Sequence, residues 1–108
     1  MNHAEFLKSV LSTANEKTGF AEKILGATLG LTGESGEVAD IVKKVHFHGH
    51  ELDRDKLKLE LGDVFYYLYR LCYLYNFEVG DVLQANSDKL KKRYSNGFSS
   101  EASKNRSE

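Results

Sequence analysis

Apolar residues recur at three- and four-residue spacings in four segments of the chain, which is the period of helices that bury one face. The pattern predicts helices over about residues 4–17, 21–46, 54–75 and 79–94. No proline interrupts them. The stretch "FYYLYRLCYLYNF" is rich in strand-forming residues, but its length and flanks favour helix. We therefore expect an all-α fold with four main helices per chain.

Glycines and capping residues punctuate this pattern. The stretch "HFHGHELDRDK" indicates a loop, with Gly49 as the breaker and Asp53 as the N-cap of the third helix. Four glycines within the second segment predict either a bend or the close approach of another backbone. They are Gly26, Gly30, Gly33 and Gly36. We expect one domain over residues 1–98 and a polar tail over residues 99–108, which has nothing to bury and should be disordered.

Composition narrows the classes of function. The formal net charge of −1 leaves no basic footprint for nucleic acid or for an anionic membrane. No apolar stretch is long enough to cross a bilayer, and no secretory pattern opens the chain. The single cysteine, Cys72, cannot form an internal disulfide and fits a reducing compartment. We expect a soluble, cytoplasmic protein that binds neither nucleic acid nor membrane.

Carboxylates border the apolar faces of the second and third helices. At about 100° of rotation per residue, Glu34 and Glu60 each lie within about 60° of the apolar stripe of their own helix. The stripe residues are Leu31, Val38, Ile41 and Val45 beside Glu34, and Leu57, Val64 and Leu71 beside Glu60. Glu37 and Asp63 flank the same stripes, three residues further on. The chain thus carries E-x-x-E on one helix and E-x-x-D on the next.

If the two stripes pack together, four carboxylates converge, and like charges so close must be protonated, paired with basic groups or bound to a cation. Oxygen ligands suit hard cations, Mg²⁺ first and Mn²⁺ second. A single E-x-x-E is usually a solvated helix face, whereas two such pairs beside apolar stripes make a metal site as good an interpretation as a solvated face. A di-iron bundle would need Glu-x-x-His, and no histidine follows a glutamate by three residues.

These motifs lie in longer segments that resemble MazG-like nucleoside triphosphate pyrophosphohydrolases. The segments are "LGLTGESGEVADIVKKVHFHGH", "KLKLELGDVFYYL" and "ANSDKLKKRYSNGF", within about residues 29–98. The family signature is E-x-x-E, a gap, then E-x-x-D on consecutive helices. The chain departs from the family where Phe65-Tyr66-Tyr67 replaces a frequent tryptophan and Ser95 a common proline. The aromatic change could alter base preference.

The resemblance implies an all-α fold that completes a helical bundle by forming a homodimer or homotetramer. It implies Mg²⁺-dependent hydrolysis of (deoxy)nucleoside triphosphates to the monophosphate and pyrophosphate, which clears surplus or non-standard nucleotides. The four acids would hold Mg²⁺, with Mn²⁺ as a substitute, and Glu34 or Glu37 could instead be the general base. Alternatives are hydrolysis of phosphoribosyl-ATP, of dUTP or of dCTP alone, and a non-catalytic module that binds a nucleotide or a partner protein.

Basic and aromatic residues complete the predicted nucleotide site. Lys44 lies two helical turns after Glu37 and could contact a phosphate. Asn86, Lys89 and Arg93 form one stripe of the fourth helix, and the matching family residues face the nucleotide. Tyr67 follows Asp63 by one turn and could stack on a base. The competing interpretations are solvated basic faces for the cations and a core position for the tyrosine.

Overall fold

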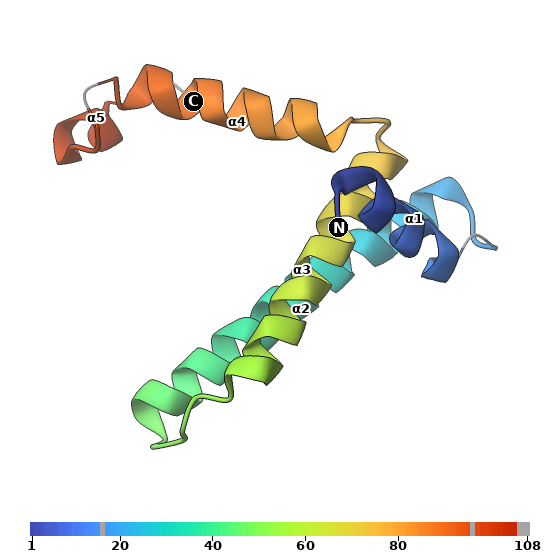
Figure 1. Cartoon of the computed structure of the whole chain (residues 1–108), viewed down its shortest axis with the longest axis horizontal. Coiled ribbons are helices and arrows are strands. Elements are labelled where there is room, and N and C mark those ends of the chain that lie inside the picture. The colour runs from blue at the N-terminus through green and yellow to red at the C-terminus, as the bar shows by residue number, and fades with distance from the viewer. Residues whose placement is uncertain (16, 96, 106–108) are drawn as a thin grey trace. The chain divides into compact units, whose positions relative to one another are not determined.

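The computed structural model describes residues 1–15, 17–95 and 97–105. Every regular secondary-structure element among these residues is a helix, as predicted (Figure 1). An isolated β-bridge also pairs Ser95 with Gly97. The elements are α1 (His3–Thr13), α2 (Phe20–Phe47), α3 (Arg54–Leu74), α4 (Val79–Arg93) and α5 (Ser100–Lys104). No helix in the described part of the chain is long and apolar enough to cross a membrane.

The chain forms two compact units, Met1–Asn76 and a second from Phe77 onward. α3 ends at Leu74, just before the boundary between the two units. Asn76 has a left-handed backbone conformation, with φ of 59°, which a continuing α-helix would not allow. The first unit contains α1, α2 and α3. The expectation of one domain over residues 1–98 stays a prediction.

In the first unit α2 and α3 run side by side as an antiparallel pair, joined by a short loop (Figure 1). The loop ends as predicted at Asp53, whose side chain accepts a hydrogen bond from the Lys56 amide at 3.1 Å. Leu31 and Val38 of α2 and Val64 of α3 are half-buried. The predicted apolar stripes of α2 and α3 therefore face each other, and their contact sets how each helix is rotated about its own axis.

α1 packs against α3 through two tyrosines. The Tyr69 ring meets the Phe6 ring edge-on, with centroids 4.8 Å apart, and its hydroxyl group bonds to the His3 ring. The Thr13 and Tyr66 hydroxyl groups lie 3.2 Å apart and share a hydrogen bond. Val10 of α1 is fully buried, at 0% exposure. This small interior fixes the first helix against the helix pair.

α1 ends at Thr13, earlier than the predicted residue 17. Polar side chains at this end bond to nearby backbone instead of extending the helix. The Thr13 hydroxyl donates to the Ser9 carbonyl at 3.0 Å, and the Asn15 side chain accepts from the Lys17 amide at 3.0 Å. Apolar spacing alone does not reveal such local competition.

In the second unit α4 is followed by α5, which lies within the tail that we expected to be disordered. The Ser99 side chain caps this short helix by accepting a hydrogen bond from the Ala102 amide at 3.0 Å, and the expectation of a disordered tail stays a prediction. Residues 106–108 of the tail lie outside the described residues. The rings of Tyr94 and Phe98 lie 5.5 Å apart between the two helices.

Candidate metal centre and nucleotide site

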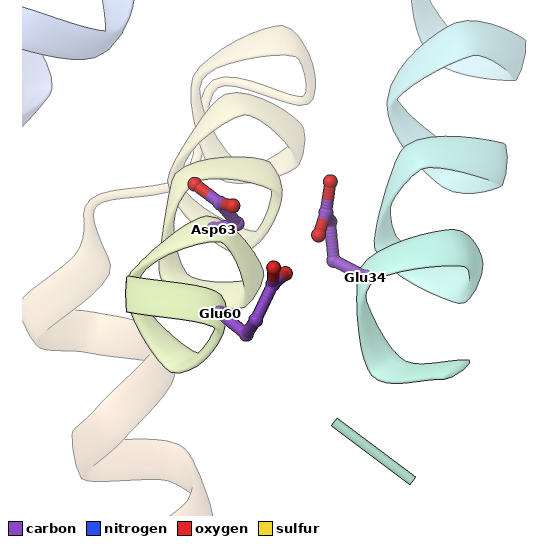
Figure 2. A group of neighbouring side chains, drawn as sticks. All are labelled: Glu34, Glu60 and Asp63. Atoms are coloured by element: carbon purple, nitrogen blue, oxygen red, sulfur yellow. The ribbon is translucent and has the colours of Figure 1, made fainter. Parts of the chain in front are cut away.

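Three acidic side chains meet between α2 and α3. Glu34 extends from α2 and Glu60 and Asp63 from α3, and Figure 2 shows Glu34 and Glu60 reaching into the space between the two helices with Asp63 beside them on α3. Each offers one carboxylate oxygen, and these oxygens lie within 4.8 Å of one another. Glu34 and Glu60 are half-buried, and Asp63 is exposed. We call these residues the acidic trio; they are three of the four acids predicted to converge.

The trio follows directly from the packing of the stripes. Glu34 stands one turn after Leu31 and one turn before Val38, so the contact that half-buries these residues also turns its carboxylate toward α3. Glu60 and Asp63 lie three residues apart on α3 and therefore share a face. The antiparallel pairing brings that face opposite Glu34.

The electrostatics of the trio show how closely the acids interact. The pKa of Glu34 lies above its ordinary value of 4.5, first because its carboxyl group shares a hydrogen bond with Glu60. Partial burial and the negative charges of Asp63, Glu60 and Glu37 raise this pKa further. A carboxyl group in such a field holds its proton more tightly, or exchanges it for a cation.

Glu37 lies outside the trio. It is exposed on α2, yet its charge adds to the raised pKa of Glu34, after the larger effect of Glu60, and to the raised pKa of Lys44, after the larger effect of Asp40. It therefore stands beside the trio rather than within it. Its roles as a metal ligand and as a base stay predictions.

Lys44 is engaged by a residue that the sequence analysis did not single out. Its ammonium group lies 2.9 Å from a carboxylate oxygen of Asp40, which also pairs with Lys43 at 3.4 Å. The hydrogen bond from Lys44 lowers the pKa of Asp40, and the same bond raises the pKa of Lys44. The i, i+4 spacing of Asp40 and Lys44 was the signal that could have identified this pair.

Tyr67 lies against Gly30 of α2 and is half-buried. Its ring meets that of Tyr66 edge-on, with centroids 5.1 Å apart. Both tyrosines line a cavity of about 410 Å³ among α1, α2 and α3. Polar groups from all three helices and from the connection between α1 and α2 share this lining, among them Thr13, Asn15, Thr18, Lys23 and Arg70.

Arg70 is the buried charged residue of this cavity, and the sequence pattern predicted neither the residue nor the cavity. Its side chain is buried, at 5% exposure, and donates to the Asn15 carbonyl at 3.5 Å. The lining comes from segments far apart in the chain, so no local spacing could have revealed it. The cavity gives the first unit a polar recess beside the aromatic pair.

Asn86, Lys89 and Arg93 all lie on α4, in the second unit. Asn86 and Lys89 are exposed, and Arg93 is half-buried with its guanidinium group 5.7 Å from the Tyr94 ring centre. Their predicted contacts with a nucleotide stay predictions.

The trio has the chemistry that a hard divalent cation requires. All its donors are carboxylate oxygens, and one side, at Asp63, is open to solvent. Mg²⁺ binds oxygen at about 2.0–2.1 Å, so two of its ligands stand roughly 3–4 Å apart. Side chains whose oxygens already lie within 4.8 Å need only small rotations to reach that separation. The residues therefore fit Mg²⁺ or Mn²⁺.

The chain belongs to a family of nucleotide pyrophosphohydrolases. The sequence profile of the MazG nucleotide pyrophosphohydrolase domain matches residues 22–98, which hold the trio, Glu37 and the polar stripe of α4. This confirms the resemblance found in the sequence. The Gene 37 protein of Mycobacterium phage L5 is 38% identical over 74 residues, which cover 65% of each chain. The chain thus spans about two thirds of the length of that relative. No solved structure matches the chain.

Proposed function

We propose that the protein is a Mg²⁺-dependent nucleoside triphosphate pyrophosphohydrolase. It converts (deoxy)nucleoside triphosphates to the monophosphate and pyrophosphate, and so removes surplus or non-standard nucleotides in the cytoplasm. The observation that carries this proposal is the acidic trio, which lies inside the segment matched by the MazG family.

The four acids have two roles, metal binding and acceptance of a proton. Glu34, Glu60 and Asp63 would hold Mg²⁺, for which Mn²⁺ could substitute, and Glu37 would complete the acidic set. When bound, Mg²⁺ would supply positive charge to neutralise the triphosphate and to lower the pKa of the attacking water. The water oxygen bonds to the α-phosphorus, the bond from that phosphorus to the bridging oxygen breaks, and pyrophosphate leaves with the electron pair. A carboxylate accepts the proton of the water: Glu37, which stands beside the trio, or Glu34.

The remaining residues bind the nucleotide. Lys44, Asn86, Lys89 and Arg93 supply positive charge and hydrogen bonds to the phosphates, while Tyr67 offers its ring to the base. The cavity beside Tyr67 supports this assignment, because Tyr67 lies only one helical turn from Asp63.

We further propose that two or four copies assemble. Among the described residues of the first unit, only Val10 and Ala27 are buried apolar residues, whereas Leu25, Leu29 and Phe65 remain 59%, 61% and 57% exposed. Apolar groups at this density on a single chain favour a second copy as cover. Light scattering at increasing protein concentration tests this, and a monomer throughout would contradict it.

The function is tested by incubating the protein with a panel of common and damaged triphosphates and Mg²⁺, followed by identification of the products. We expect monophosphate and pyrophosphate, lost in Glu60→Gln and kept in Glu51→Gln, a matched change in the exposed loop. Turnover confined to dUTP, dCTP or phosphoribosyl-ATP would identify a specialised enzyme. Nucleotide binding without turnover would instead indicate a binding module, and would refute the proposed activity.

A further inference from the structure

α2 passes α3 at a point where only glycine fits. A Cβ atom placed on Gly30 would lie 2.3, 2.4 and 2.7 Å from the Cε1, Cζ and Cδ1 atoms of the Tyr67 ring. Real Cβ atoms do not approach other atoms more closely than about 3.0 Å. The ring therefore occupies the space that any side chain at position 30 would need.

The other glycines of this helix are different. A Cβ atom on Gly26, Gly33 or Gly36 would meet no described atom within 4 Å, so each could carry a methyl group. Gly30 is also the position where the predicted close approach to the helix occurs, although a side chain approaches rather than a backbone. Its lack of a side chain thus has a specific cause, which its three neighbours do not share.

The contact between Gly30 and Tyr67 lies between the acidic trio and the cavity. Gly30 lies one turn before Glu34 on α2, and Tyr67 lies one turn after Asp63 on α3, so the ring stands about 6 Å along the helices from the acidic trio. Further along lie Gly26 and Arg70, which line the cavity. Because α2 and α3 are antiparallel, the order along the pair is trio, Tyr67 ring, cavity.

We propose that Gly30 is a positioning residue for the nucleotide: by carrying no side chain, it lets the Tyr67 ring lie against α2 and form a fixed wall between the trio and the cavity. The sugar and base of a nucleotide whose phosphates lie at the trio pack against this wall. The inference rests on the proposed function and deepens it, since Gly30 then sets nucleotide affinity without touching the metal.

The effect of adding one methyl group follows from the distances. The ring would have to withdraw by about 1 Å, from 2.3 Å to the 3.4 Å at which ordinary contact begins. Tyr66, which meets the ring edge-on at 5.1 Å, lies next to it and limits that movement. Stacking of a base on an aromatic ring contributes enough to change affinity roughly 5- to 150-fold. A displaced wall should lose a large part of that contribution.

The test compares four variants by steady-state kinetics and by Mg²⁺ titration: Gly30→Ala, Gly36→Ala, Tyr67→Leu and the double variant Gly30→Ala/Tyr67→Leu. We expect Gly30→Ala to raise KM for the best triphosphate at least about fivefold, with Mg²⁺ affinity unchanged. Gly36→Ala is the matched control and should keep the wild-type KM. The double variant should have the KM of Tyr67→Leu, because without the ring the methyl group displaces nothing.

Three outcomes would overturn the inference: a wild-type KM in Gly30→Ala, KM increases that multiply in the double variant, or equal losses of metal and nucleotide affinity. If Gly30→Ala fails to fold, as judged by helical circular dichroism, the double variant decides. Recovery of the fold together with the KM of Tyr67→Leu supports the inference, and failure to recover refutes it.

The failure of this inference can be told apart from failure of the proposed function. If the wild-type protein neither hydrolyses nor binds any triphosphate, measured by calorimetry with a non-hydrolysable analogue and Mg²⁺, the proposed function falls and this inference with it. If the wild-type protein turns over and Gly30→Ala matches it, only the role of Gly30 is refuted.

Discussion

Replacing Glu60 with glutamine removes one of three charges from the acidic trio while keeping the size of the side chain. The three ligand oxygens lie within 4.8 Å of one another, so the change takes the formal charge of the trio from −3 to −2 and removes an anionic ligand. Changes to groups that merely support a ligand typically weaken metal binding by about 10- to 100-fold. Loss of a ligand itself should therefore cost at least about a hundredfold.

Thermal unfolding with and without Mg²⁺ measures this loss. At a Mg²⁺ concentration about 100 times the wild-type Kd, binding should add about 2.7 kcal/mol to the wild-type free energy of unfolding. The same concentration would only equal the Kd of Glu60→Gln and add about 0.4 kcal/mol. For a chain of this size these values correspond to increases in Tm of roughly 10 °C and 2 °C.

The metal-free proteins should show the opposite order. Without Mg²⁺ the trio is a cluster of like charges, so Glu60→Gln should be at least as stable as the wild type. Glu51→Gln, in the exposed loop, should follow the wild type under both conditions. If Glu60→Gln lost the same stability with and without Mg²⁺, Glu60 would be a packing residue and not a metal ligand.

Three further predictions concern the rest of the molecule. Because Glu60 and the other neighbouring acids raise the pKa of Glu34, the protonated Glu34 should stabilise the metal-free fold fully below pH 4.5, and this stability should be lost as pH rises through the raised pKa. Glu34→Gln should flatten that part of the plot of stability against pH. The Mg²⁺ affinity of the wild type should rise over the same pH interval. Val10→Ala should cost about 2 kcal/mol in urea unfolding, since Val10 is fully buried, and a change near zero would contradict the described core. Lys44→Met should raise the nucleotide KM by up to about fivefold without changing Mg²⁺ affinity; an unchanged KM would assign Lys44 to its pair with Asp40 alone.

The helices and the facing of their stripes could be predicted because both follow from one local quantity, the rotation per residue. That rotation placed Glu34 and Glu60 beside apolar residues, and the short loop at Asp53 brought the two faces together. The early end of α1 and the existence of α5 could not be predicted from apolar spacing. Both depend on single polar groups, at Asn15 and Ser99, that bond to nearby backbone amides.

The site was only partly predictable for a similar reason. Spacing placed four acids on two faces, but it could not tell that Glu37 would stand outside the group formed by the other three. It also could not find the cavity, whose lining comes from three separate helices, or the contact at Gly30, which depends on the absence of a side chain. Lys44 was predicted as a phosphate contact, and its pairing with Asp40 came from the structure.

The most direct measurement of whether the acidic trio supports attack on a nucleotide is hydrolysis in heavy-oxygen water with Mg²⁺, followed by mass spectrometry of the products. We predict that the wild-type protein places the heavy oxygen in the monophosphate and releases unlabelled pyrophosphate, and that Glu60→Gln yields neither product. Label in orthophosphate, or undiminished turnover by Glu60→Gln, would contradict the account.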